Sequence, residues 1–306
     1  MPVVIERRAR PTLTALELDA GDTLRFTLAD GPVRTLRFLD PWARIVRTTL
    51  PLPLVETKGA VTVYAFGCTL EVDGEHHALF REVGTQRSFY EPWCVGGLHL
   101  WLDAVDDAFG FLHETHGACR PSRRIRIALQ DAALPICPEP LLPWCPLPPG
   151  GLAITDCYAG ENCWLGAYDG ASAHAGLDVD HAAGTPIFAP VHLDEHGLFE
   201  TVYDGHGNNR WRGVRRWDDG SAWTLECHHV VRLTVPAGGP VSAGTQVARG
   251  AGTAVGAFEH SHFEFAVRDG DDLVRLDPWI LFWQTYLDVH GRPSERRAHL
   301  EAPRSA

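Results

Sequence analysis

The feature that most constrains the fold is a proline-rich segment near the middle of the chain. Residues 135–150 contain seven prolines. A proline fixes its own φ angle and lacks a backbone N–H, so this segment cannot continue a helix or a central strand. We therefore predict a stiff linker at 135–150. The 306 residues leave room for a modest core on each side, in domains at 1–134 and 151–290.

The first of these domains is predicted to be β-rich. Apolar and polar side chains alternate, wholly or in part, at residues 24–28, 33–38 and 124–129. The turn residues Ala-Asp-Gly-Pro at 29–32 predict a hairpin between the first two of these strands. A short helix is expected from residue 100 to about 113.

The second domain is predicted to be an antiparallel β-sheet domain. Strand signals separated by Gly, Asp and Asn turns occur at residues 187–189, 198–203, 223–227 and 262–267. Proline near the start of the apolar run 278–287 predicts a short helix there. The charged residues 291–306 are expected to form a flexible tail. The predicted fold class is mainly β, with an antiparallel domain after a separate β-rich one.

Composition limits the possible partners and locations. The net charge of −12 argues against nucleic acid as a partner. No run of 18 apolar residues occurs, so no transmembrane segment is expected. The first eight residues lack the apolar stretch of a secretory signal. Cys137, Cys145, Cys157 and Cys163 are compatible either with disulfides or with reduced thiols, and the sequence leaves both open.

Two short motifs contain the residues of a possible metal site. His260 and His262 are two residues apart, so on a strand both imidazoles face the same side. One of them can bind a metal while the other handles protons. His174 and Asp178 form a second pair upstream. Two nitrogens and one carboxylate oxygen make a three-ligand zinc set whose fourth position is free for water, as in catalytic zinc sites.

The order of these motifs resembles the M23 family of zinc metallopeptidases, the lysostaphin-like peptidoglycan endopeptidases. That family has His-x-Gly-hydrophobic-Asp, then Gly-Thr-Pro-hydrophobic-x-Ala, a lone His on a strand, and His-x-His-Phe-Glu. The corresponding residues here begin at His174, Gly184 and His260. The resemblance covers roughly residues 151–287, and it implies the β-rich lysostaphin-like fold for this part of the chain.

The resemblance also implies a role for each site residue. His174, Asp178 and His262 would be the ligands of a Zn²⁺ ion, and His260 would be a catalytic histidine beside it. These assignments cover four of the five site residues that the family pattern requires.

The fifth position, a second catalytic histidine, falls on His228 or His229. The family has this histidine in a Tyr-x-His-Leu type context, and residues 227–233 match that context best with His229 in its place. Strand alternation would then place His229 and Cys227 on the site face and His228 behind it. Cys227 replaces the usual tyrosine of the family, which puts substrate contacts at that position in doubt.

The function that the resemblance implies is that of a zinc metalloendopeptidase. It would hydrolyse peptide bonds in bacterial peptidoglycan cross-links or stem peptides, by zinc-activated water with histidine assistance. The expected location is extracellular or periplasmic. Two alternatives stay open: a catalytically silent binding or regulatory module, and a zinc peptidase that acts on a protein. The bond cut, the role of residues 1–134 and the oligomeric state are not indicated.

Other histidine motifs are weaker candidates. His192 to His196 fits His-x-x-Glu-His, a zinc motif that requires a helix. Pro190 before it and Gly197 after it leave less than two turns, so we predict a hairpin tip instead. His113 and His116 have helical spacing, but without further support they are interpreted as surface histidines.

Overall fold

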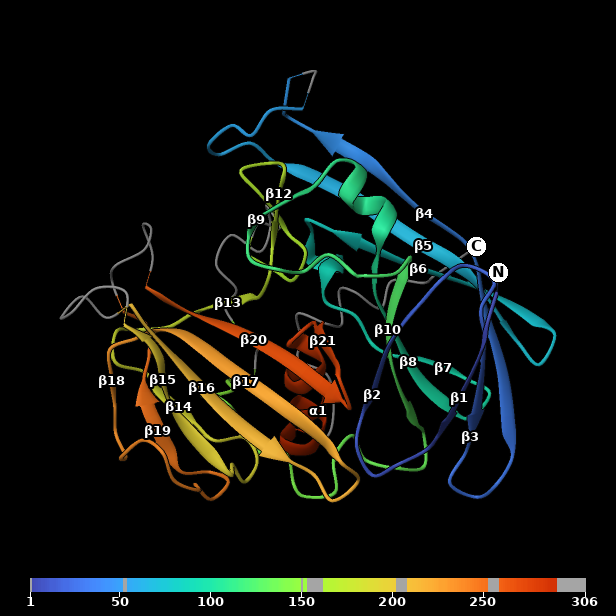
Figure 1. Cartoon of the computed structure of the whole chain (residues 1–306). Helices are drawn as coiled ribbons and strands as arrows, with labels where there is room; N and C mark the ends of the chain where they lie inside the picture. Colours follow the sequence, from blue (N-terminus) through green and yellow to red (C-terminus); the bar gives the residue numbers. More distant parts are fainter. Residues whose placement is uncertain are drawn as a thin grey trace. The chain divides into compact units, whose positions relative to one another are not determined.

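The protein is mainly β and consists of several sheets with predominantly antiparallel pairing (Figure 1). Its structure is a computed structural model, which describes residues 2–51, 54–149, 151–152, 162–201, 208–252 and 259–290. The expected tail at 291–306 and Cys157 lie outside the described residues. Within them, no helix is both long and apolar enough to cross a membrane.

Contacts divide the chain into two compact units. Unit 1 comprises Met1–Pro138, Tyr158–Glu161 and Leu165–Ala175, and unit 2 comprises Glu139–Cys157, Asn162–Trp164 and Gly176–Ala306. The proline-rich segment, expected to be one linker, is thus divided between the units. Most of its apolar side chains are buried, among them Ile136 in unit 1 and Trp144 in unit 2.

The part of unit 1 that the structure describes contains three sheets. The first has the order β1-β3-β4-β5-β6, from β1 (Val4–Arg8), β3 (Thr23–Thr27), β4 (Val33–Thr48), β5 (Thr62–Val72) and β6 (Glu75–Val83). The second has the order β2-β10-β8-β7, from β2 (Thr14–Leu18), β10 (Ile125–Asp131), β8 (Leu98–Val105) and β7 (Trp93–Val95). The third has the order β11-β12-β9, from β11 (Ala167–Tyr168), β12 (Ser172–His174) and β9 (His113–His116). Two 3₁₀ helices, η1 (Gln86–Ser88) and η2 (Asp106–Gly110), connect strands.

The predicted hairpin of unit 1 is confirmed, and the predicted helix is wrong. Strands β3 and β4 pair in antiparallel register on either side of the turn at 29–32. Residues 98–105 form strand β8, and within the expected range only residues 106–110 are helical, in the 3₁₀ helix η2. Almost every residue of β8 is buried on both faces of its sheet, and Trp101 interrupts the alternation of leucines with His99 and Asp103 that would identify a half-exposed strand.

Among its described residues, unit 2 contains two sheets and one α-helix. The larger sheet has the order β13-β20-β17-β16-β15, and β21 pairs with β20. Its strands are β13 (Leu177–Asp180), β20 (His260–Asp269), β17 (Ser221–Val230), β16 (Asn209–Arg216), β15 (Glu195–Thr201) and β21 (Asp272–Leu276). The smaller sheet consists of β14 (Pro186–Phe188), β19 (Gln246–Arg249) and β18 (Arg232–Leu233). The predicted C-terminal helix is α1 (Trp279–His290), and Asp277 Oδ1 caps it by accepting a hydrogen bond from the Trp279 N–H at 2.9 Å.

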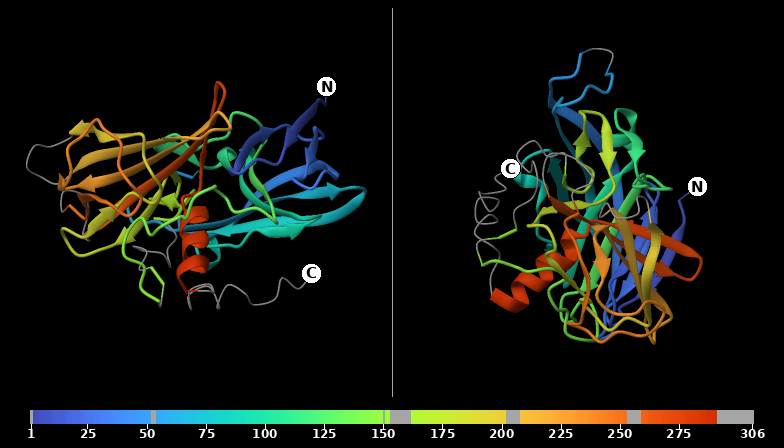
Figure 2. Two further views of the ribbon diagram at one scale, coloured as in Figure 1. Left: turned by 90° about the horizontal axis from the view of Figure 1, so that it is seen from below. Right: turned by 90° about the vertical axis from the view of Figure 1, so that its left-hand side faces the viewer.

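The two faces of strand β20 have opposite character. Phe263 and Phe265 point into the core, where the Phe263 ring lies 5.3 Å from Phe282 of α1 and 4.9 Å from Trp144. Helix α1 therefore covers this face of the larger sheet (Figure 2). His262 and Glu264 alternate with the two phenylalanines and so lie on the other face.

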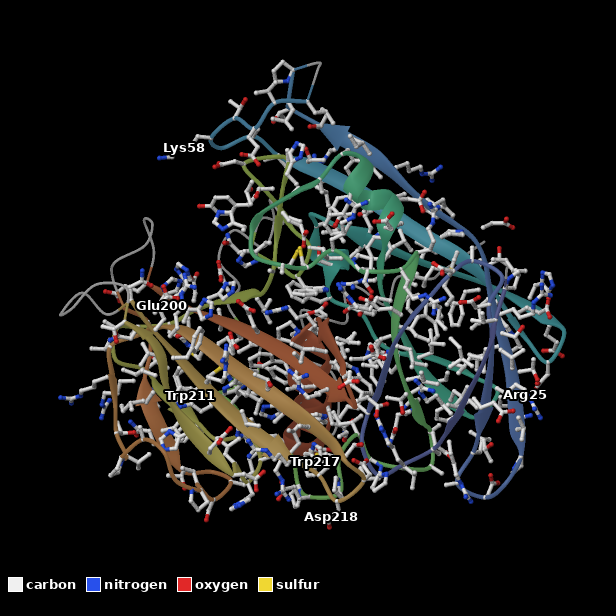
Figure 3. All side chains as sticks on the ribbon, in the orientation of Figure 1. Arg25, Lys58, Glu200, Trp211, Trp217 and Asp218 are labelled. Carbon is white, nitrogen blue, oxygen red and sulfur yellow. The ribbon has the colours of Figure 1, made fainter. Side chains whose placement is uncertain are left out.

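Trp223 is an anchor of the unit 2 core. It is fully buried on β17, and its ring meets Trp217 (labelled in Figure 3) and Phe265 edge-to-face at 5.2 and 5.1 Å. We expect Trp223→Ala to lower the free energy of unfolding by about 3–5 kcal/mol, since it leaves a large cavity. Urea denaturation measures the change. The control is Leu273→Ala, at a 40% exposed position, and an equal loss in both variants would contradict the expectation.

Candidate metal centre

Strand pairing positions the three predicted metal ligands, His174, Asp178 and His262. Asp178 on β13 is the direct antiparallel partner of His262 on β20, so their side chains emerge on the same face of the sheet. His174 ends β12, whose backbone is held by β9 and by hydrogen bonds to Gly166 O and from Leu165 N, both at 2.9 Å. The chain between His174 and Asp178 is short and passes through Gly176.

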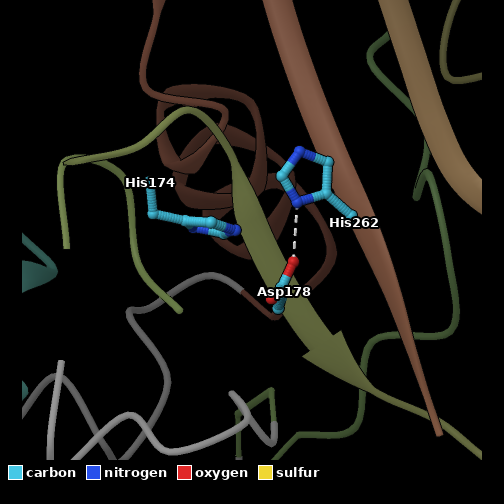
Figure 4. A group of neighbouring side chains, drawn as sticks. All are labelled: His174, Asp178 and His262. Atoms are coloured by element: carbon cyan, nitrogen blue, oxygen red, sulfur yellow. Dashed lines mark hydrogen bonds and ion pairs between the residues drawn. The ribbon is translucent and has the colours of Figure 1, made fainter. Parts of the chain in front are cut away.

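The structure brings these three side chains together (Figure 4). One donor atom from each of His174, Asp178 and His262 lies within 4.8 Å of the others. All three residues are buried, with 3%, 4% and 9% of their surface exposed. The separation between His262 Nδ1 and Asp178 Oδ1 is 2.7 Å. Two imidazole nitrogens and one carboxylate oxygen that converge in this way match the donor set of a catalytic zinc site.

The charges around His262 also fit a bound cation. Its Nε2 lies 3.3 Å from Glu264 Oε1, so carboxylates flank both ring nitrogens. Burial opposes protonation of His262, but the hydrogen bonds and charges of Asp178 and Glu264 outweigh burial and raise its pKa to about 10. The site thus holds a positive charge at the position where a zinc ion would be bound, and zinc would compete with that proton. The residues present fit the metal.

The remaining two predicted residues, His229 and His260, lie beside this cluster. Their ring centroids are 4.6 Å apart, and His260 Nε2 is 3.7 Å from Asp178 Oδ2. Asn208 Oδ1 accepts a hydrogen bond from His229 Nδ1 at 2.8 Å, which leaves Nε2 as the proton acceptor. Burial and the neighbouring His260 and His262 lower the pKa of His229 to about 3, so its ring is neutral.

The expected orientation of His228 and Cys227 is wrong. His228 is the register partner of His262, and the two rings stack at 4.7 Å, so His228 is on the site face. Cys227 pairs with Phe263 on the core side and is fully buried, and this burial raises the pKa of its thiol. Strict alternation fails after His228, because His229 has a left-handed φ of 61°.

A register shift accompanies this left-handed residue. Between Cys227 and Val230 strand β17 advances three residues, while its partner β16 advances only from Trp211 to Asn209. The additional residue on β17 is the signature of a β-bulge, which redirects side chains. Both His228 and His229 therefore reach the site, an arrangement that a simple strand does not allow.

Neither a role for Glu264 nor the site-facing position of His228 is predicted from the sequence. These two residues and His262 form a second group whose donor atoms lie within 4.8 Å of one another. The sequence signal for Glu264 was its position two residues after His262, on the same face of the strand. Asn208, the partner of His229, gives no comparable signal, because it lies 21 positions away in the chain.

The other histidine motifs do not form a metal site among the described residues. His192 precedes β15, which contains Glu195 and His196, so no helix brings the two histidines together. His196 donates from Nε2 to Pro236 O at 2.9 Å and accepts at Nδ1 from Trp211 Nε1 at 3.3 Å. His113 and His116 are exposed on β9, which agrees with their interpretation as surface residues.

Gly176 allows the close approach on which this site depends. A Cβ at this position would overlap the His262 ring and would lie 2.7 Å from Phe263 O. We expect Gly176→Ala to weaken zinc binding and to destabilise the protein by about 1–3 kcal/mol through overpacking. Zinc titration by calorimetry and urea denaturation measure the two effects. Gly239→Ala is the control, since a Cβ there has no heavy atom within 4 Å; unchanged zinc affinity in Gly176→Ala would contradict the expectation.

Comparison with known proteins gives low-scoring structural matches. No family model and no curated protein matches the chain. The catalytic domain of lysostaphin, an antimicrobial peptidase from Staphylococcus simulans, is 23% identical, with a match covering 36% of this chain and 80% of that chain at a TM-score of 0.29. A putative peptidase M23 from Pseudomonas aeruginosa is 14% identical over 90% of this chain and 95% of that one, with a TM-score of 0.31.

A zinc-containing peptidase from Vibrio cholerae is 12% identical, over 80% of this chain and 85% of that one, with a TM-score of 0.29. All of these TM-scores are below 0.5, so these structural matches carry no functional argument.

Proposed function

We propose that this protein is a zinc-dependent metalloendopeptidase that hydrolyses peptide bonds in bacterial peptidoglycan, in cross-links or stem peptides. The observation that carries the proposal is the buried convergence of His174, Asp178 and His262, with two further histidines beside it. The substrate class, and an extracellular or periplasmic location, come from the motif resemblance to M23 peptidases.

His174, Asp178 and His262 would hold the zinc ion. When bound, the ion supplies Lewis-acid chemistry, polarising the carbonyl of the peptide bond and activating water. Glu264 accepts a hydrogen bond from His262 Nε2, which orients the ring so that Nδ1 faces Asp178.

His229 and His260 would move the protons of the reaction. With Nδ1 of His229 bonded to Asn208, its Nε2 is available to accept a proton from the attacking water. His260, whose ring lies 4.6 Å from that of His229, would stabilise the developing oxyanion or donate a proton to the leaving amine.

The proposal is tested by release of free amino groups from purified peptidoglycan. We expect release from the zinc-loaded protein, and none after chelation or in His262→Ala. Release that persists in His262→Ala would refute the metal mechanism. If zinc binds stoichiometrically and no amine appears, the same assay on a mixture of folded proteins distinguishes a protein-directed peptidase from a silent binding module.

A further inference from the structure

The open face of the larger sheet in unit 2 contains a groove next to the candidate metal centre. The groove has a volume of about 360 Å³ and runs over β16, β17, β20 and β21, which lie side by side in Figure 1. Glu264 is in its lining and also bonds His262 Nε2 at 3.3 Å. The groove is therefore continuous with the face on which the proposed zinc ligands lie.

Small side chains form the floor of this groove. Along β20, the residues on the open face after His262 are Glu264, Ala266 and Arg268. Ala266 lies opposite Thr224 of β17, and Arg268 lies opposite Ala222. A floor of alanine and threonine leaves space above the sheet, which an extended peptide strand can occupy.

The spacing along β20 sets the reach of such a peptide. Residues on one face of a strand recur every ~6.7 Å, so Arg268 lies about 20 Å along the strand from His262. An extended peptide advances about 3.3 Å per residue. A group held by Arg268 would therefore be about six residues from the bond being cut, and a group held at the level of Ala266 about four.

Arginines surround the floor, in a chain whose net charge is −12. Four of the residues that line the groove are arginines and three are glutamates: Arg212, Arg216, Arg268, Arg275, Glu195, Glu226 and Glu264.

Three of these arginines already face a glutamate. Arg212 forms an ion pair with Glu226 at 2.7 Å, and Arg216 forms one with Glu195 at the same distance. Arg275 Nε lies 3.9 Å from Glu264. Exposed Arg268 has no carboxylate within 4.0 Å among the described residues. It is thus the arginine that is available to an incoming anion.

Resting on the function proposed above, we propose that this groove binds an extended peptide substrate that bears a carboxylate, and that Arg268 recognises the carboxylate. Guanidinium groups bind carboxylates through paired N–H donors, which favours an acidic side chain or a free C-terminus over an amide. The groove would then select peptides whose acidic group lies about four to six residues from the scissile bond.

Binding of matched peptides tests this proposal without any hydrolysis. The probes are a capped glycine–serine octapeptide with one glutamate near its end and the same peptide with glutamine. Dissociation constants are measured by NMR titration of the full chain in the presence of a chelator. We expect the glutamate peptide to bind about threefold to fivefold more tightly, as for an exposed ion pair, with shifts on β20 and β21.

Three variants distinguish recognition by Arg268 from a general effect of the protein's positive charges. Arg268→Ala should remove the preference for glutamate, and Arg268→Lys should retain part of it. Arg232→Ala, at an exposed arginine on β18, should leave the preference unchanged.

Equal affinities for the two peptides, or a preference that survives in Arg268→Ala, would overturn the proposal. If the preference holds and peptidoglycan is not hydrolysed, only the proposed activity fails; if hydrolysis occurs without a preference, only the groove proposal fails.

Discussion

Replacing Asp178 with asparagine should abolish tight zinc binding and reduce hydrolysis to background. The asparagine side chain keeps the shape but loses the negative charge that faces His262 at 2.7 Å and His260 at 3.7 Å. Mutation of a residue that only hydrogen-bonds a metal ligand typically lowers metal affinity by about 10–100-fold, so we expect a larger loss when a direct ligand is replaced. Zinc titration by calorimetry measures the affinity, and amine release measures the activity.

Thermal unfolding gives a readout of Asp178→Asn that does not need activity. Zinc at 100 times its dissociation constant stabilises the folded protein by about 2.7 kcal/mol, which raises Tm. This zinc-dependent shift should disappear in Asp178→Asn and persist in Asp272→Asn, an exposed position on β21. A full shift in Asp178→Asn would show that zinc binds elsewhere, for instance at His228, His262 and Glu264.

Much of the proposed site follows from short-range sequence rules. A His-x-His pair on a strand places both rings on one face, and the structure has His260 and His262 on β20 as this rule requires. The pairing of β13 with β20 then places Asp178 opposite His262. What the sequence does not provide is the register itself, which depends on the packing of Phe263 and Phe265 against the core.

The parts that sequence reasoning missed depend on departures from regular strands. His229 adopts a left-handed φ of 61°, and a bulge on β17 brings it and His228 to the same site. A non-glycine residue gives no sequence signal for this conformation, which local contacts must stabilise. The helix expected from residue 100 to about 113 is wrong over 100–105 for a different reason, since buried Trp101 shares a face with His99 and Asp103 and interrupts the alternation of the strand.

The role of strand β9 in holding the strand that ends at His174 could not be predicted from the sequence either. Residues 113–116 belong to the N-terminal part of the sequence, yet they pair with β12, which ends at His174. The backbone oxygen of His116 also accepts a hydrogen bond from the Ala175 N–H at 3.1 Å. Pairing between segments about 60 residues apart arises from tertiary contacts, and no motif in either segment indicates it.

His229→Ala should lower kcat by about 10²–10⁴ without loss of zinc, because it removes a positioned proton acceptor from the site. Its Nδ1 is held by Asn208 at 2.8 Å, and its ring lies 4.6 Å from His260. His228→Ala should have a smaller effect, about tenfold or less, because His228 stacks on His262 at 4.7 Å, lies 3.5 Å from Glu264 through its Nε2, and acts by orienting the His262 ring.

Comparing His229→Ala with His228→Ala decides which of these two histidines accepts the proton. Zinc content by atomic absorption must stay at the wild-type level in both variants, so that the loss of kcat is not a loss of metal. The pH profile of kcat/KM is the discriminating measurement, since removal of a proton acceptor flattens one limb of the profile and removal of an orienting ring does not. A larger loss of kcat in His228→Ala, with its zinc retained, would assign the catalytic role to His228, and the left-handed His229 would then serve to position His260.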